Sequence, residues 1–143
     1  MRKRFLSTVL VLIMLLSLAP MSALADDTFR SGDFTFVIET GVACVKKYNG
    51  SSASVTVPSK VEYDGVTYKV RNIHQDAFKN CTTIQKLVLP ETVNRIGKQA
   101  FANCTSLNSI TINGDLNEFY TVDNTFYNIG ANSDYLNVTF GPE

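Results

Sequence analysis

The sequence predicts a mainly β solenoid with short helical turns, in which stacked rungs of short strands follow an N-terminal β cap and hairpin region. Two observations carry this prediction. First, Ala77 to Gln99 and Ala100 to Val122 align at a shift of 23 residues, with apolar residues coinciding at seven positions. Second, each unit has apolar residues at alternate positions, the period of a strand with one buried face. A unit this short cannot bury that face alone, so neighbouring units must stack.

The first 25 residues have the features of a secretory signal peptide. Arg2-Lys3-Arg4 precedes an apolar run from Phe5 to Leu18, and Ala23-Leu24-Ala25 places small residues where a signal peptidase cleaves. The apolar run of about 14 residues is shorter than the roughly 20 needed to span a bilayer. We therefore expect cleavage after Ala25, a secreted or cell-surface location, and no membrane insertion of the mature chain.

Composition leaves few chemical functions open. Removal of 25 of the 143 residues leaves 118, which suits one domain with a modest core. The mature chain has ten basic and thirteen acidic residues, a balance of about −3 that does not attract nucleic acid. Its one histidine, His74, and its three cysteines, Cys44, Cys81 and Cys104, lack the spacing of a zinc site. We expect no metal and no other cofactor.

The mature chain divides into two parts. Residues 26–58 form the expected N-terminal β cap region, and residues 59–143 form the repeats, with partial repeats at both ends. The first partial repeat is visible where Val70 to Phe78 matches Val93 to Phe101. Just before it, alternating apolar residues around Asp64-Gly65 predict a hairpin with a two-residue turn.

Each repeat contains one short strand that organises the core. Leu87-Val88-Leu89 is matched upstream by Val55-Thr56-Val57 and downstream by Val138-Thr139-Phe140. Because strand side chains alternate between faces, we expect the two leucines to point inward and Lys86 and Val88 to point outward. Later in the unit, an Ala-Phe-x-Asn element such as Ala77–Asn80 suits one short helical turn whose Phe fills the opposite side of the coil.

The stretch NIHQDAFKNCTTIQKLVLPETVNRIGKQAFANCTSLNSITI resembles the BspA-like subclass of leucine-rich repeats, which occur on secreted and surface proteins of bacteria. The segment GVACVKKYNGSSASVTVPSKVEYDGVTYKV resembles the region that precedes such repeats. The sequence departs from the repeat pattern at His74, Asn113 and Ile129, which stand in the slots of Gly97, Pro90 and Cys81. The resemblance implies a leucine-rich-repeat solenoid with a non-catalytic role in adhesion to other proteins.

The outward strand positions would line one extended face, and in solenoids such a face is the usual contact surface. It is small, mostly uncharged and polar, so it indicates binding to an extracellular protein or glycan without naming either. The candidate binding face consists of Thr56, Lys86, Val88, Ser109, Thr111, Asn137 and Thr139. Tyrosines such as Tyr63 and Tyr68 could form a binding surface instead, or be cross-strand partners in the hairpin.

Two other functions compete with this one. In the first, the chain is a structural spacer or the N-terminal portion of a longer surface protein, because NVTFGPE begins a fresh rung without a polar capping repeat. The open β edge there would favour self-association. In the second, the chain is a secreted hydrolase using His74 or turn carboxylates such as Asp76, Glu91, Asp115 and Glu118. No phosphate loop, zinc motif or nucleophile elbow supports catalysis, so we expect no enzyme activity.

Three short motifs are better explained by the repeat than by chemistry. Cys81 and Cys104 occupy one site in successive rungs, about 5 Å apart, where a disulfide competes with a ladder of free, buried thiols. We favour thiols, because a ladder points both side chains the same way. Asn80-Cys81-Thr82 matches a glycosylation pattern only because the repeat recurs. Leu89-Pro90-Glu91-Thr92 looks like a wall-sorting signal, but Val93 follows it instead of Gly.

Overall fold

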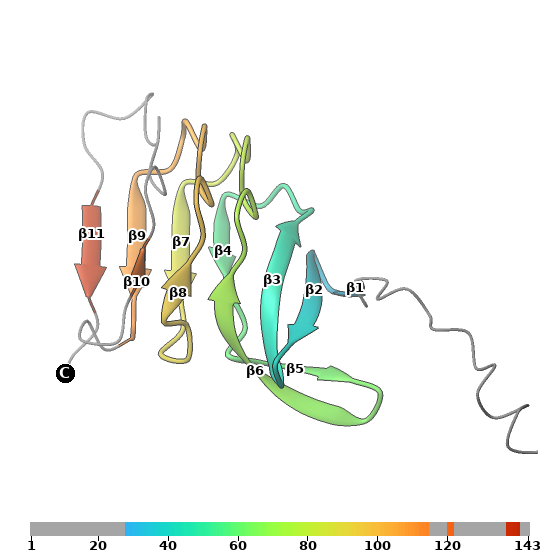
Figure 1. Ribbon diagram of the computed structural model, residues 1–143. Coiled ribbons are helices and arrows are strands. Elements are labelled where there is room, and N and C mark those ends of the chain that lie inside the picture. The colour runs from blue at the N-terminus through green and yellow to red at the C-terminus, as the bar shows by residue number, and fades with distance from the viewer. Residues whose placement is uncertain (1–27, 115–119, 122–136, 141–143) are drawn as a thin grey trace, which may run out of the picture.

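The computed structural model describes residues 28–114, 120–121 and 137–140, and within them the chain is built from strands and turns. Strands stack side by side from β1 at one end to β11 at the other, in two layers (Figure 1). The mainly β solenoid is therefore confirmed. The expected signal peptide lies outside the described residues, as do Ile129 and the carboxylates of Asp115 and Glu118.

One layer is a four-stranded parallel sheet, here called the short sheet, in the order β11-β9-β7-β4. The register of this sheet confirms the repeat alignment, since Leu87 pairs with Val55 on one side and with Ile110 on the other. Leu89, the first letter of the apparent sorting signal, is the buried last residue of β7. The strands are β4 (Ser54–Thr56), β7 (Lys86–Leu89), β9 (Ser109–Ile112) and β11 (Asn137–Phe140).

The other layer is a seven-stranded sheet, here called the long sheet, in the order β1-β2-β3-β6-β8-β10, with β5 paired to β6. Its first three strands pair antiparallel and form the N-terminal end, whereas β3, β6, β8 and β10 pair parallel. The strands are β1 (Thr28–Ser31), β2 (Phe34–Glu39), β3 (Val42–Tyr48), β5 (Lys60–Tyr63), β6 (Val66–Ile73), β8 (Arg95–Ile96) and β10 (Tyr120–Thr121).

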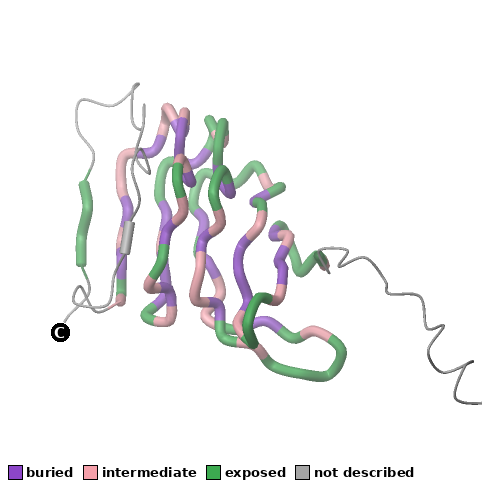
Figure 2. Tube along the Cα trace, viewed as in Figure 1, coloured by how far each residue is buried: buried purple, intermediate pink, exposed green. Residues whose placement is uncertain are grey.

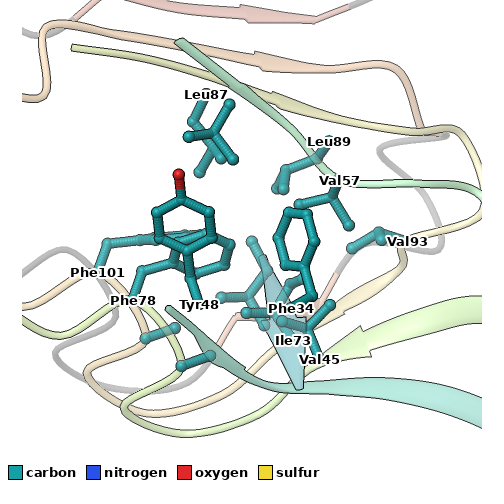
Figure 3. Close-up of a cluster of buried hydrophobic side chains, with 14 of the residues drawn as sticks. Phe34, Val45, Tyr48, Val57, Ile73, Phe78, Leu87, Leu89, Val93 and Phe101 are labelled. Atoms are coloured by element: carbon teal, nitrogen blue, oxygen red, sulfur yellow. The ribbon is translucent and has the colours of Figure 1, made fainter. Parts of the chain in front are cut away.

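The core lies between the two sheets, because alternate residues of each strand point inward. Leu87 and Leu89 are buried while Lys86 is exposed and Val88 half-buried, as the strand period predicts. In the long sheet, Ile73 and Ile96 are the buried, inward-pointing residues. Side chains from both sheets point toward one another in Figure 3, and Figure 2 shows buried segments recurring rung after rung. One apolar interior therefore supports both sheets.

Aromatic rings fill the third side of the coil. Tyr48, Phe78 and Phe101 occupy equivalent places in three rungs. The ring centroids of Tyr48 and Phe78 are 5.5 Å apart, and those of Phe78 and Phe101 are 5.4 Å apart. Figure 3 shows these three rings gathered at one side of the core. Phe34 of β2 packs against Tyr48 at a centroid distance of 5.3 Å. The N-terminal strands thus extend the aromatic ladder and cover its first rung.

The predicted short helical turn around Phe78 is a tight turn instead, and the described residues contain no helix. Asp76 and Asn80 have φ values of 58° and 64°, which interrupt a right-handed helix. The backbone N–H groups of Phe78 and Asn80 donate to carbonyls of the next rung, those of Ala100 and Ala102, at 2.8 Å each. These amides bond between rungs, so they are not available for helical bonds within a rung.

The predicted hairpin is confirmed, with Asp64-Gly65 as its two-residue turn and both residues at positive φ. It projects away from the stacked strands in Figure 1. Tyr63 and Tyr68 are not directly opposite each other, because Tyr63 pairs with Val66 and Tyr68 with Val61. Tyr63 instead stacks on Phe29 of β1, with ring centroids 4.3 Å apart. The two rings therefore help to join the hairpin to the N-terminal strands.

Candidate functional site

The register of the short sheet brings the seven predicted face residues together. They stand in two rows that cross the strands. The first row runs through Lys86, Ser109 and Asn137. The second row runs through Thr56, Val88, Thr111 and Thr139. With strands about 4.8 Å apart, the three residues of the first row extend over roughly 10 Å and the four of the second over roughly 14 Å. We call this surface the threonine face.

The threonine face is open to solvent and has a single charge among the predicted residues. Lys86 and Thr56 are exposed, whereas Ser109 and Thr111 are half-buried by their neighbours. The hydroxyls of Thr111 and Thr139 lie 3.4 Å apart and share a hydrogen bond. Such a surface can offer hydroxyl and ammonium groups to a partner.

The sequence prediction omitted one member of this face. Ser54 pairs with Lys86 and is exposed, so it completes the first row. The sequence indicates this position too, because Ser54 is two residues from Thr56 and strand residues two apart share a face.

The three cysteines are free thiols, so the prediction of unpaired Cys81 and Cys104 is confirmed. Cys104 is buried and its thiol donates to the Phe78 carbonyl at 3.1 Å, whereas Cys81 is half-buried. Burial raises the pKa of the Cys104 thiol to about 12 and also raises that of Cys81. High pKa values keep both thiols protonated, which makes them poor nucleophiles at neutral pH.

Cys44 lies on the long sheet, in a small polar cluster. Asn72 donates its Nδ2–H to the sulfur at 3.3 Å, and the thiol donates to the Glu39 carboxylate at 3.4 Å. Burial is the main reason that the pKa of Cys44 rises to about 11, with Glu39 adding to the effect and Asn72 opposing it. Cys44 is therefore also a protonated, structural thiol.

His74 lies at an open cleft on the long sheet, which Glu39, Asn72 and Arg95 also line. Its ring Nδ1 is 3.4 Å from the Gln75 carbonyl oxygen, and no described side chain hydrogen-bonds the ring. The nucleophile and orienting carboxylate of a triad are thus not in place around His74 within the described part of the chain.

Among the described residues, no group of three or more His, Cys, Asp or Glu side chains could hold a metal ion. None of the described segments is a helix with the length and apolar character needed to cross a membrane.

Stacked parallel rungs with an apolar ladder inside and a polar face outside define a leucine-rich-repeat solenoid. The sequence matches the BspA type leucine rich repeat region over residues 48–135, in six copies. That match covers more than half of the chain, so the protein belongs to the BspA-type leucine-rich-repeat family, as its sequence indicated.

Solved structures of bacterial proteins agree with this assignment. A leucine-rich cell surface protein from Faecalibacterium prausnitzii A2-165 is 29% identical with a TM-score of 0.57, over 71% of this chain and 25% of that one. A leucine-rich repeat protein from Bacteroides capillosus ATCC 29799 is 25% identical with a TM-score of 0.61, over 80% of this chain and 99% of that one. The chain thus spans a quarter of the first protein and nearly all of the second. No curated protein matches the sequence.

Proposed function

We propose that the chain is a secreted or surface-exposed, non-catalytic module that binds an extracellular protein or glycan through its threonine face, a role that includes adhesion. The observation that carries the proposal is the shared register of β4, β7, β9 and β11, which gathers outward side chains of four rungs into one continuous surface. The signal-peptide features of residues 1–25 support export. Similarity to a leucine-rich cell surface protein supports the same location.

The chemistry of the threonine face favours a polar contact. Hydroxyl groups both donate and accept hydrogen bonds, so Thr56, Ser109 and Thr111 suit sugar hydroxyls or a partner's backbone. Lys86 adds one exposed positive charge near the middle of the sheet. The absence of a charge cluster among the described face residues disfavours a polyanion as partner.

The test is a triple variant, Lys86→Glu, Ser109→Glu and Thr111→Glu, screened for binding to immobilised glycans and extracellular proteins. We expect at least tenfold weaker binding to whatever partner the native chain retains, because three carboxylates replace neutral or positive groups. The matched control is Lys60→Glu, Ser51→Glu and Thr67→Glu, which makes the same chemical changes at exposed residues away from the face. Equal binding by both variants would exclude the threonine face as the site.

A spacer role is the second candidate, and the edge strand β11 favours it. Val138 and Phe140 stand at inward positions yet are 41% and 47% exposed, and among the described strands β11 pairs only with β9. An open apolar edge favours pairing with further β structure or with a second copy of the chain. Under this proposal the native chain forms concentration-dependent dimers in sedimentation experiments, and Phe140→Asp abolishes them. A native chain that sediments as a monomer at all concentrations would contradict self-association through β11.

A further inference from the structure

The long sheet has a cleft of about 460 Å³ that the proposed function does not use. Clefts that bind small molecules commonly measure about 300–1,000 Å³, so its size suits a small ligand. Its polar lining comes from the end of β2, from β6 and β8, and from the turns that follow. The polar side chains concerned are Glu39, Asn72, His74, Gln75, Arg95 and Lys98.

A β-bulge sets the orientation of the cleft. Between β3 and β6, Ala43 pairs with Val70 but Cys44 pairs with Asn72, so Arg71 is an extra residue in β6. The bulge places Asn72 opposite Cys44 on the outer side of the sheet, while Ile73 points into the core. Bulges re-aim side chains and are common beside functional sites.

Residues of opposite charge line the cleft from strands on either side of Asn72. Cys44, Asn72 and Arg95 form one row across three neighbouring strands, so the outer two are about 10 Å apart at two strand spacings. The Glu39 carboxylate accepts a hydrogen bond from the Cys44 thiol at one end of this row. The Arg95 backbone stands at the other end, and its exposed side chain carries a charge that lowers the pKa of Cys44. Lys98 also lines the cleft, two residues beyond the end of β8.

No ion pair joins these charged side chains within the described residues. Among the described residues, Lys79 and Asp76 form an ion pair at 3.1 Å, outside the cleft. Glu39, Arg95 and Lys98 therefore have no ion-pair partner in the described part of the chain. A cleft lined by one carboxylate and two cations, none of them ion-paired with another described residue, suits a ligand that carries both charges.

We propose that this cleft binds a short peptide with free termini, whose carboxylate contacts Arg95 and Lys98 and whose ammonium contacts Glu39. Guanidinium groups bind carboxylates in a bidentate manner, and a carboxylate accepts hydrogen bonds from an ammonium. An extended peptide spans at most about 3.5 Å per residue, so three residues cover the roughly 10 Å between the two ends of the row. Asn72, half-buried between those ends, can accept from a peptide N–H through its Oδ1.

Titration of the full chain with trialanine tests this proposal, followed by amide chemical shifts in NMR spectra. We expect shifts at the amides of Ile73, Gly97 and their neighbours and none on β7 or β9. Arg95→Gln should weaken binding of trialanine at least tenfold. Arg30→Gln, an exposed arginine of β1, is the matched control and should bind like the native chain.

Modified peptides separate the two charged ends. N-acetylated trialanine should bind the native chain more weakly than trialanine does. The Glu39→Gln variant should bind these two peptides equally well. C-amidated trialanine should bind the native chain more weakly than trialanine, because it loses the contact with Arg95. Glu62→Gln, an exposed carboxylate of the hairpin, is the control for Glu39. The spectrum of each variant shows directly whether it is folded.

Two results would overturn the proposal. One is the lack of any shift at the cleft up to the solubility limit of trialanine. The other is stronger binding of glucuronate than of trialanine, unaffected by Glu39→Gln, which would identify an acidic sugar site. Neither result bears on the threonine face, whose Lys86, Ser109 and Thr111 lie on the other sheet, so this proposal and the proposed function fail separately.

Discussion

The two sheets share one core but differ on their outer surfaces. The four strands of the short sheet share one apolar pattern, and its outer surface has two rows of mostly uncharged polar side chains with one lysine and one valine. The long sheet begins with three strands that precede the first full rung, and its outer surface has a bulge at Arg71, a buried thiol at Cys44 and a charged cleft. A regular repeat thus gives a flat surface, and the junction with the N-terminal strands creates the cleft.

The largest effect is expected where the two sheets depend on the same residue. Phe78 is fully buried and packs against both Tyr48 and Phe101. Phe78→Ala should lower the free energy of unfolding by about 3–5 kcal/mol, measured by urea denaturation, because it leaves a cavity in the shared core. Val66→Ala, at an exposed residue of the hairpin, is the control. A loss below about 1 kcal/mol would mean that the sheets do not rely on this ladder.

A smaller effect should distinguish the long sheet from the short one. A Cβ on Gly97 would lie 2.5 Å from the Gln75 nitrogen and 2.8 Å from the His74 carbonyl carbon, both backbone atoms of the previous rung. Gly97→Ala should therefore cost about 1–3 kcal/mol, the usual range for overpacking. Urea denaturation measures the loss, and hydrogen exchange should show faster exchange of the Gly97 amide, which bonds to the Ile73 carbonyl.

The matched control for that substitution is Gly114→Ala. A Cβ at Gly114 would meet the Val93 carbonyl oxygen at 3.0 Å, a less severe contact than at Gly97. We expect a smaller loss of stability at Gly114. The reverse order would show that the rungs of the long sheet can separate at Gly97 without cost.

Sequence reasoning predicted the short sheet better than the long one for a physical reason. The period of 23 residues fixes which residues pair, and the pairing of Leu87 with Ile110 follows directly. The cleft depends on an extra residue at Arg71, which no period marks, and on Glu39, which belongs to no repeat. The helical turn at Phe78 was wrong because local sequence does not reveal that its amide bonds to the next rung.

Buried thiols should make stability depend on pH in both parts of the molecule. A thiol is neutral when protonated. Below about pH 9 the thiols are protonated in both the folded and the unfolded chain, so their ionisation does not lower the free energy of unfolding. Above that pH the unfolded thiol ionises first, because burial raises the folded-state pKa to about 11 for Cys44 and about 12 for Cys104. The free energy of unfolding should therefore fall from about pH 9 toward pH 11.

Single variants separate the thiols from other groups that titrate in this range. The fall in stability between pH 8 and pH 11 should be smaller in Cys44→Ala and in Cys104→Ala than in the native chain, when urea denaturation is repeated at each pH. If Cys44→Ala shows the same fall as the native chain, then the cluster with Asn72 and Glu39 does not exclude water from the thiol.

The smallest effect on stability is expected on the threonine face. Lys86 and Thr56 are exposed and have no role in the core, so Lys86→Ala and Thr56→Ala should each change the free energy of unfolding by less than about 0.5 kcal/mol. Leu87→Ala is the contrasting variant, because the adjacent side chain is buried and its loss should cost about 2–5 kcal/mol. Urea denaturation measures all three. A loss of more than about 1 kcal/mol in the free energy of unfolding of Lys86→Ala would show that this side chain stabilises the fold. A neutral result is the one expected for a side chain whose role is to contact a partner.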